Sequence, residues 1–248
     1  MPDPAPIFLR AAWHDLVMVN FEVDPALLAP RVPAGTELDL WQGRALASVV
    51  GFRFLRTRVM GIPIPFHVNF PEVNLRFYVR RRVGAESRRG VVFVKEIVPR
   101  AAIAWVARTV YGETYVSLPM REEVDLPTRG EPGVGRAAYA WKRDGRWESV
   151  EAHVDGPSVV RAEGTEEAFV TEHYWGYAGH AGSPTTEYAV EHPRWTVRNA
   201  VRARLDCDVA ALYGREFADA LSGLPSSAFV ADGSDVVVRR GRPLAVAP

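Results

Sequence analysis

The chain contains very little cysteine and very little lysine. Its 248 residues include one cysteine, Cys207, and two lysines, Lys95 and Lys142, beside 28 arginines. A single cysteine excludes an internal disulfide and a cysteine-rich zinc site, and it is typical of a reducing compartment. We therefore expect a cytoplasmic protein.

Several signals of other protein classes are also missing. No run approaches about eighteen uncharged apolar residues, and the N-terminus lacks a basic segment followed by an apolar one, so neither a membrane span nor secretion is predicted. The net charge is zero, which argues against general attraction to nucleic acid or to a membrane surface. The six histidines form no ligand-spaced cluster, and no nucleophile elbow or phosphate-binding glycine loop occurs. We expect no metal and no cofactor.

Apolar residues recur mostly with a period of two, which is typical of strands. This pattern, broken by a few helical stretches, predicts a strand-rich α+β fold in a single domain over residues 1–248. Turn residues at Gln42-Gly43, Gly84 and Asp144-Gly145 predict three hairpins. The strands expected are Leu16 to Val23, Thr36 to Trp41, Arg44 to Phe54, Phe70 to Arg82, Arg89 to Val98, Arg136 to Lys142, Trp147 to Val154, Glu187 to His192, Thr196 to Leu205 and Val236 to Arg239.

Helical spacing marks four shorter stretches. Asp24 is placed as an N-cap, with Pro25 at the first helical position. The helices expected are Pro25 to Arg31, Pro99 to Tyr111 before a stop at Gly112, Thr165 to Tyr174 before a stop at Gly176, and Val209 to Leu221.

One expected strand carries polar residues at every second position. Glu72, Asn74, Arg76 and Tyr78 alternate with apolar residues, so an acid, an amide, a guanidinium and a phenol share one face. An interior face of this kind would hold a small polar ligand. The alternative is an ordinary strand with one solvent face.

The next expected strand places Lys95 beside Glu96. Strict alternation puts Val91, Phe93 and Ile97 on one face and Val92, Val94 and Val98 on the other, so at least one charge is expected inside. If Lys95 is the inward residue, a lowered pKa would make it a Schiff-base nucleophile. The alternative is a structural pair with a carboxylate such as Glu72.

Two further segments gather aromatic and titratable residues. They are Thr171 to Tyr177 and His192 to Trp195. Both segments suit a ligand-binding wall, although such residues also pack ordinary cores. Separately, Arg108 and Tyr111, three apart on an expected helix, either close over a cavity mouth or are ordinary packing residues. The additional candidate binding residues are Arg108, Tyr111, Glu172, Tyr174, Tyr177 and His192.

Arginines crowd the tip of the hairpin from Arg80 to Arg89. These arginines would bind an acidic partner if the chain is an interaction protein. The alternative is that they form a solvent-exposed hairpin tip without a binding role. Aromatic stacking partners for RNA are missing nearby.

These motifs together resemble the YqjF-like family of unknown function, domain of unknown function 2071, within the acetoacetate decarboxylase-like superfamily. The resemblance covers most of the chain. It implies a cone-shaped antiparallel β-barrel with short flanking helices, an interior cavity, and self-association as a homo-oligomer. The motifs that carry it are Glu72-x-Asn74-x-Arg76-x-Tyr78-Val79, Gly90-Val-Val-Phe93, Ala107-Arg108, Tyr111-Gly112, Thr171-Glu172-His173-Tyr174 with Tyr177, and His192-Pro193-x-Trp195.

The chain departs from the decarboxylases at their reactive lysine. Those enzymes hold a Pro-Lys-Lys triplet, whereas the corresponding segment here is Pro99-Arg-Ala-Ala. The resemblance therefore does not carry decarboxylase activity to this chain, and whether it is an enzyme stays open. We expect a barrel cavity that binds a small carboxylate or carbonyl compound through Arg76 and its neighbours. The alternatives are a lyase or related enzyme using Lys95, and an interaction protein using the arginine hairpin.

Overall fold

The structure is a computed structural model that describes residues 5–63, 67–99, 115–180 and 183–244. Long strands form most of it, and the helices are short. The first part comprises β1 (Ile7–Val23), α1 (Pro25–Leu28), η1 (Ala29–Arg31), β2 (Glu37–Leu38), β3 (Ala45–Val59), β4 (Ile62–Pro63), β5 (Phe70–Val83) and β6 (Glu86–Val98). The second comprises β7 (Tyr115–Ser117), β8 (Met120–Asp125), β9 (Val134–Arg143), β10 (Arg146–Asp155), β11 (Val159–Val160), α3 (Glu166–Thr171), β12 (Trp175–Ala178), β13 (Thr186–Glu191), β14 (Thr196–Asp206), α4 (Val209–Tyr213), η2 (Arg215–Phe217), β15 (Ser227–Arg239) and β16 (Arg242–Pro243).

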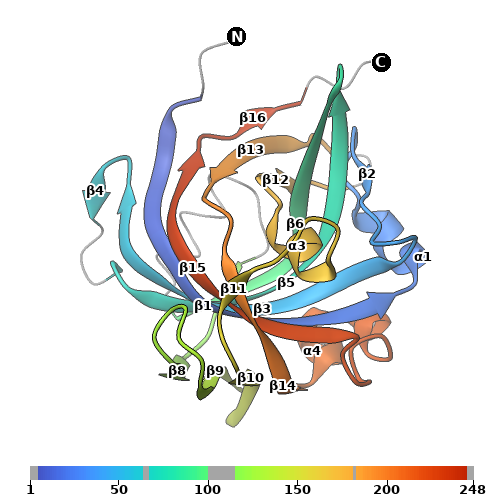
Figure 1. The fold of residues 1–248 in the computed structure, drawn as a ribbon. Helices are drawn as coiled ribbons and strands as arrows, with labels where there is room; N and C mark the ends of the chain where they lie inside the picture. The colour runs from blue at the N-terminus through green and yellow to red at the C-terminus, as the bar shows by residue number, and fades with distance from the viewer. Residues whose placement is uncertain (1–4, 64–66, 100–114, 181–182, 245–248) are drawn as a thin grey trace.

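Strand pairing closes part of the sheet into a ring. The order is β13-β12-β6-β5-β3-β1-β15, and β15 pairs back with β13 through Val190 opposite Val238. Figure 1 shows these strands curving around an interior. Pairing is mostly antiparallel, but β6 pairs in parallel with both β12 and β7. The expected strand-rich α+β fold is confirmed.

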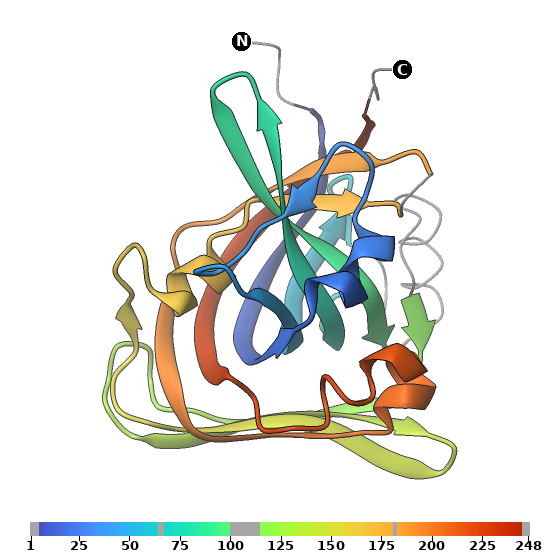
Figure 2. The ribbon, with the colours of Figure 1, turned by 90° about the vertical axis from the view of Figure 1, so that its right-hand side faces the viewer.

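Strands β14, β10, β9 and β8 cover one outer face of the ring. From β15 the sheet continues through β14, β10 and β9 to β8, and Figure 2 shows these strands as a layer beneath β1, β3 and β5. Buried residues of the two layers meet in what we call the outer core, for example Leu75 and Phe77 against Tyr139 and Trp141. A second cluster, the ring core, lies inside the ring and includes Phe52, Tyr78, Phe169 and Trp195. The covered parts of β1, β3 and β5 are therefore buried on both faces, which explains their apolar content.

Four β-bulges or register irregularities interrupt the alternation in the described ring strands, one of them between Ile7 and Leu9 in the β1–β15 pair. β1 has an extra residue near Asp15 and β3 one near Arg56, both with positive φ, at 57° and 54°. β6 has an extra residue at Val94. A bulge adds one residue to a strand. If odd-numbered side chains face inward before the bulge, even-numbered ones face inward after it, and the reverse. The inward pairs that straddle the bulges are Trp13 and Leu16, Phe54 and Thr57, and Phe93 and Glu96.

Local signals located several elements correctly. Asp24 caps α1 by accepting a hydrogen bond from the Ala26 amide at 2.8 Å. The hairpin of β5 and β6 forms around Gly84, and that of β9 and β10 forms around Asp144-Gly145. The Pro99 to Tyr111 helix lies largely outside the described residues.

The predicted hairpin across Gln42-Gly43 is wrong. The turn exists, with positive φ at both residues and mutual backbone hydrogen bonds of 2.9 Å between Trp41 and Arg44. However, β2 pairs with β5, with Glu37 opposite Arg80, and not with β3. The side of β3 that a hairpin partner would occupy is taken by β5, so only the bridge at the turn remains.

Two predicted helices are shorter than expected. α3 ends at Thr171, and Gly176 lies inside β12 instead of terminating a helix. A Cβ atom at Gly176 would lie 2.1 Å from Cζ of Tyr188, so this glycine permits close packing of β12 against β13. The helix expected to reach Leu221 divides at Gly214, whose φ is 116°.

Candidate functional site

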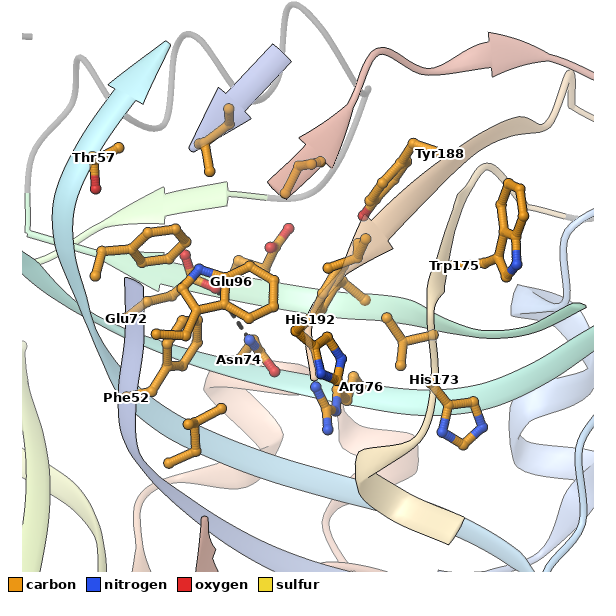
Figure 3. A pocket seen from close by; sticks show the side chains of 18 of the residues that line it. Phe52, Thr57, Glu72, Asn74, Arg76, Glu96, His173, Trp175, Tyr188 and His192 are labelled. Carbon is orange, nitrogen blue, oxygen red and sulfur yellow. Dashed lines mark hydrogen bonds between the residues drawn. The ribbon is translucent and has the colours of Figure 1, made fainter. Parts of the chain in front are cut away.

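A cavity of about 140 Å³ lies inside the ring, against the polar face of β5. Figure 3 shows Glu72, Asn74 and Arg76 pointing into it, with Glu96 from β6 and His192 from the end of β13. Aromatic residues form much of the remaining wall: Trp13, Phe52, Phe54, Phe70, Phe93, Tyr188 and Trp195. A mostly apolar wall with a few convergent polar groups is the usual character of a small-molecule site.

The polar row on β5 faces the interior, not the solvent. Glu72 is 3% exposed and Asn74 1% exposed. The amide nitrogen of Asn74 donates to Oε1 of Glu72 at 3.1 Å. Asn74 lies opposite Glu96 across the β5–β6 pair, so the three polar side chains are clustered.

Arg76 brings a half-buried positive charge to the cavity. Its Nη2 donates to the carbonyl of Val170 at 3.4 Å and lies 4.0 Å from the sulfur of Met18. Its Nε has no hydrogen-bond partner, and within the described residues no carboxylate forms a salt bridge with it. The guanidinium therefore keeps donor capacity for a ligand.

His192 places an imidazole beside Arg76 in the cavity (Figure 3). The ring stacks on Trp195 with a centroid separation of 4.1 Å, and Nδ1 lies 2.9 Å from the Pro193 carbonyl. Since a carbonyl only accepts, Nδ1 carries a proton. Burial lowers the pKa of His192, and the nearby Arg76 charge acts in the same direction. In the neutral ring Nε2 is then the acceptor.

Glu96, and not Lys95, lines the cavity. The bulge at Val94 places Phe93, Glu96 and Val98 on the inner face, so the strict alternation expected for this strand is wrong. Lys95 points to the outer core side and donates to the carbonyl of Leu212. Burial lowers the pKa of Lys95, with a contribution from the charge of Arg143.

The structure places four other candidate residues away from the cavity. The hydroxyl of Tyr78 lies 2.6 Å from Ser48 Oγ, in the ring core. Glu172 and Tyr174 hydrogen-bond to each other, and Tyr177 donates to Glu187 at 3.1 Å. The polar groups of these four residues are thus occupied by protein contacts. Arg108 and Tyr111 lie outside the described residues.

His173 is buried next to the cavity beside an ion pair. Its Nε2 lies 3.4 Å from Asp39 Oδ2, and Arg89 Nε donates to the same Asp39 oxygen at 2.6 Å. Burial lowers the pKa of His173 from 6.5 to about 4, although the hydrogen bond with Asp39 acts to raise it. The ring is therefore neutral at pH 7, and it packs 4.6 Å from the ring of Tyr78.

The arginine-rich hairpin is neutralised by local ion pairs. Arg81 and Arg88 both contact Glu187, at 3.1 and 2.8 Å. Arg80 contacts Glu37 at 2.8 Å, and Arg89 contacts Asp39. These pairs leave little uncompensated positive charge for an acidic partner.

Sequence reasoning missed several residues of the cavity wall. Trp13, Thr57 and Tyr188 come from three strands that carry no obvious polar row. The bulges in β1 and β3 bring Leu16 and Thr57 to the inner face, and neither bulge has a glycine or proline that would reveal it. Within the described residues no group of three or more His, Cys, Asp or Glu side chains is arranged to hold a metal ion. The helices found there are all too short or too polar to cross a bilayer.

Solved structures of enzymes share this fold. The enduracididine biosynthesis enzyme MppR superposes with a TM-score of 0.69 in its HEPES complex, at 16% identity over 98% of this chain and 90% of that chain. Its complex with pyruvate gives 0.67, at 17% identity over 99% and 92%. Acetoacetate decarboxylase from Legionella pneumophila gives 0.63, at 12% identity over 99% and 92%. The fold is thus acetoacetate decarboxylase-like.

The family follows from the sequence comparison. Residues 10–235 match the model of DUF2071, described as an uncharacterized conserved protein, and the chain belongs to this family. It is also similar to the uncharacterized protein YqjF of Bacillus subtilis (strain 168), with 25% identity over 198 residues, 77% of this chain and 76% of that protein.

Proposed function

We propose that this protein binds a small carboxylate or carbonyl compound in the ring cavity, with Arg76 donating to its oxygen atoms. The proposal rests on one observation: several buried polar atoms at the cavity lack hydrogen-bond partners among the described residues. These atoms are Trp13 Nε1, Thr57 Oγ1, Asn74 Oδ1 and Arg76 Nε. Buried polar atoms are costly to leave unpaired, so this concentration favours a polar occupant.

The chemistry of these groups favours an anionic or carbonyl oxygen. The indole and guanidinium are donors without acceptor capacity, and a guanidinium binds carboxylates through charge-assisted hydrogen bonds. The fold gives further support, because MppR is described as complexed with pyruvate, a small keto acid.

The hypothesis of a Schiff base at Lys95 receives no support from the geometry. The amine contacts the Leu212 carbonyl on the other side of β6 from the cavity. A ligand in the cavity would therefore reach the Lys95 amine only if the conformation of β6 changed.

A thermal-shift titration tests the proposal. Small keto and hydroxy acids of three or four carbons should raise the melting temperature in a concentration-dependent way, because a ligand that binds the native state stabilises it. In Arg76→Ala the apparent affinity should fall by at least about tenfold, the scale of one lost charge-assisted hydrogen bond.

The control is Arg82→Ala, on the same strand. The Arg82 side chain is 77% exposed and lies 3.7 Å from Glu37, outside the cavity. This variant should respond to the acids as the wild type does. Equal stabilisation of the wild type and Arg76→Ala, or none in the wild type, would contradict the proposal.

A further inference from the structure

The orientation of the Asn74 amide is determined by its neighbour. Its Nδ2 donates to Oε1 of Glu72 at 3.1 Å. A carboxylate accepts hydrogen bonds, so the amide nitrogen must be the atom on that side. The amide oxygen therefore points the other way.

That oxygen is an acceptor without a donor. Asn74 is 1% exposed, it lines the cavity, and its Oδ1 has no hydrogen-bond partner in the described part of the chain. A ligand carbonyl or carboxylate oxygen would not satisfy this atom, because all three groups are acceptors. A hydroxyl or ammonium group would.

Donor and acceptor lie side by side on one strand. Asn74 and Arg76 are two residues apart on the inner face of β5, a rise of about 7 Å. Arg76 offers N–H groups and Asn74 offers an oxygen. The site is therefore complementary to a bifunctional ligand, with an anion at one end and an N–H or O–H donor near the other.

Cavity volume limits the size of that ligand. The cavity holds about 140 Å³, close to the roughly 150 Å³ of an engineered apolar cavity that binds benzene. About six or seven non-hydrogen atoms fit such a space.

We infer that the ligand is a short carboxylate carrying a hydroxyl or ammonium donor, and that Asn74 selects this donor over a carbonyl. The inference rests on the proposed function and narrows it. Arg76 holds the carboxylate, and Asn74 Oδ1 accepts from the donor group, so a keto acid of equal size leaves the amide oxygen unpaired.

Calorimetric titration of four matched acids tests this selection. 3-Hydroxybutyrate, 3-aminobutyrate, acetoacetate and butyrate share a four-carbon chain and a carboxylate, and they differ at one carbon. The better of the hydroxy and amino acids should bind about tenfold more tightly than acetoacetate and butyrate. Acetoacetate or butyrate binding as tightly as both donors would overturn the inference.

Asn74→Leu removes the acceptor at similar volume. This variant should bind all four acids with affinities within about threefold of one another, with Arg76 still contacting the carboxylate. The control is Asn199→Leu, outside the cavity on β14, where the full preference should persist. The wild-type series decides the question by itself if Asn74→Leu does not fold.

The two proposals fail in different ways. If none of the four acids binds the wild type, the proposed function is contradicted. If they bind through Arg76 without preference for a donor, only the selection by Asn74 is contradicted.

Discussion

His173 carries a neutral imidazole inside the protein, and this makes stability depend on pH. Burial lowers the pKa of His173 from 6.5 to about 4. Between pH 6.5 and pH 4 the imidazole is mostly protonated in the unfolded chain but mostly neutral in the folded chain. The free energy of unfolding therefore decreases as the pH falls from 6.5 towards 4. The contribution of this residue amounts to at most about 3 kcal/mol.

We expect this loss to be visible in urea unfolding from pH 7 to pH 4. His173→Gln lowers stability at every pH because the ring packs between Tyr78 and Phe169. Its unfolding free energy should nevertheless fall less steeply with acid than that of the wild type. Parallel profiles would mean that His173 takes up its proton equally in both states.

Single residues also show how far the site was predictable. The row of Glu72, Asn74 and Arg76 was visible as alternation, and these residues line the cavity. The choice between Lys95 and Glu96 was not visible, because it depends on the bulge at Val94. A bulge depends on how two strands pair, and no residue of this valine-rich segment indicates where one occurs.

Strand packing between elements depends on one glycine. β12 lies against β13, and the ring of Tyr188 covers Gly176 so closely that an added Cβ atom would lie 2.1 Å from Cζ. Gly176→Ala should lower the unfolding free energy by about 1–3 kcal/mol through overpacking. Adding Tyr188→Ala should recover part of this loss, which a double-mutant cycle of urea unfolding would measure.

The matched control is Gly223→Ala. No atom lies within 4 Å of a Cβ at that position, and its φ is not in the left-handed region. Its stability should stay within about 0.5 kcal/mol of the wild type. A Gly176→Ala protein as stable as this control would contradict the close packing described for β12.

Elements were predictable where a local signal decides them. Asp24 and Pro25 start a helix by capping, and Asp144-Gly145 turns a hairpin. The hairpin predicted for Thr36 to Trp41 is wrong because long-range pairing determines the partner of a short strand, and here that partner is β5. Gly176 was misread as a helix stop because its role is set by Tyr188, twelve residues along the chain.

Arg198 connects distant parts of the whole molecule. It is 1% exposed, and its guanidinium donates to the carbonyls of Pro127, Thr128 and Glu131 between β8 and β9, and to Gly156 after β10. This one side chain therefore connects two segments of the outer layer, the β8–β9 connection and the end of β10, to β14. Removing it leaves these carbonyls without the Arg198 donor and removes a large buried side chain.

Arg198→Met should lower the unfolding free energy by about 3 kcal/mol. The control is Arg202→Met, an exposed arginine on the same strand, for which the change should be below about 0.5 kcal/mol. Urea unfolding followed by tryptophan fluorescence measures both. Similar effects of the two substitutions would contradict the structural role of Arg198.

At the scale of the molecule, the ring places the polar face of β5 against a small cavity. Seven strands, β13, β12, β6, β5, β3, β1 and β15, form the ring. Because of the bulges, several side chains point to the inner face that would point outward under strict alternation. The proposed function requires a small carboxylate or carbonyl compound in that cavity, bound to Arg76.

A crystal structure of the protein soaked with 3-hydroxybutyrate would show directly whether the acid occupies the ring cavity. We expect density for the acid inside the ring, with its carboxylate within hydrogen-bond distance of Arg76 and its hydroxyl donating to Asn74 Oδ1. An empty ring cavity at saturating acid, or an acid bound there without contact to Arg76, would contradict the proposed function.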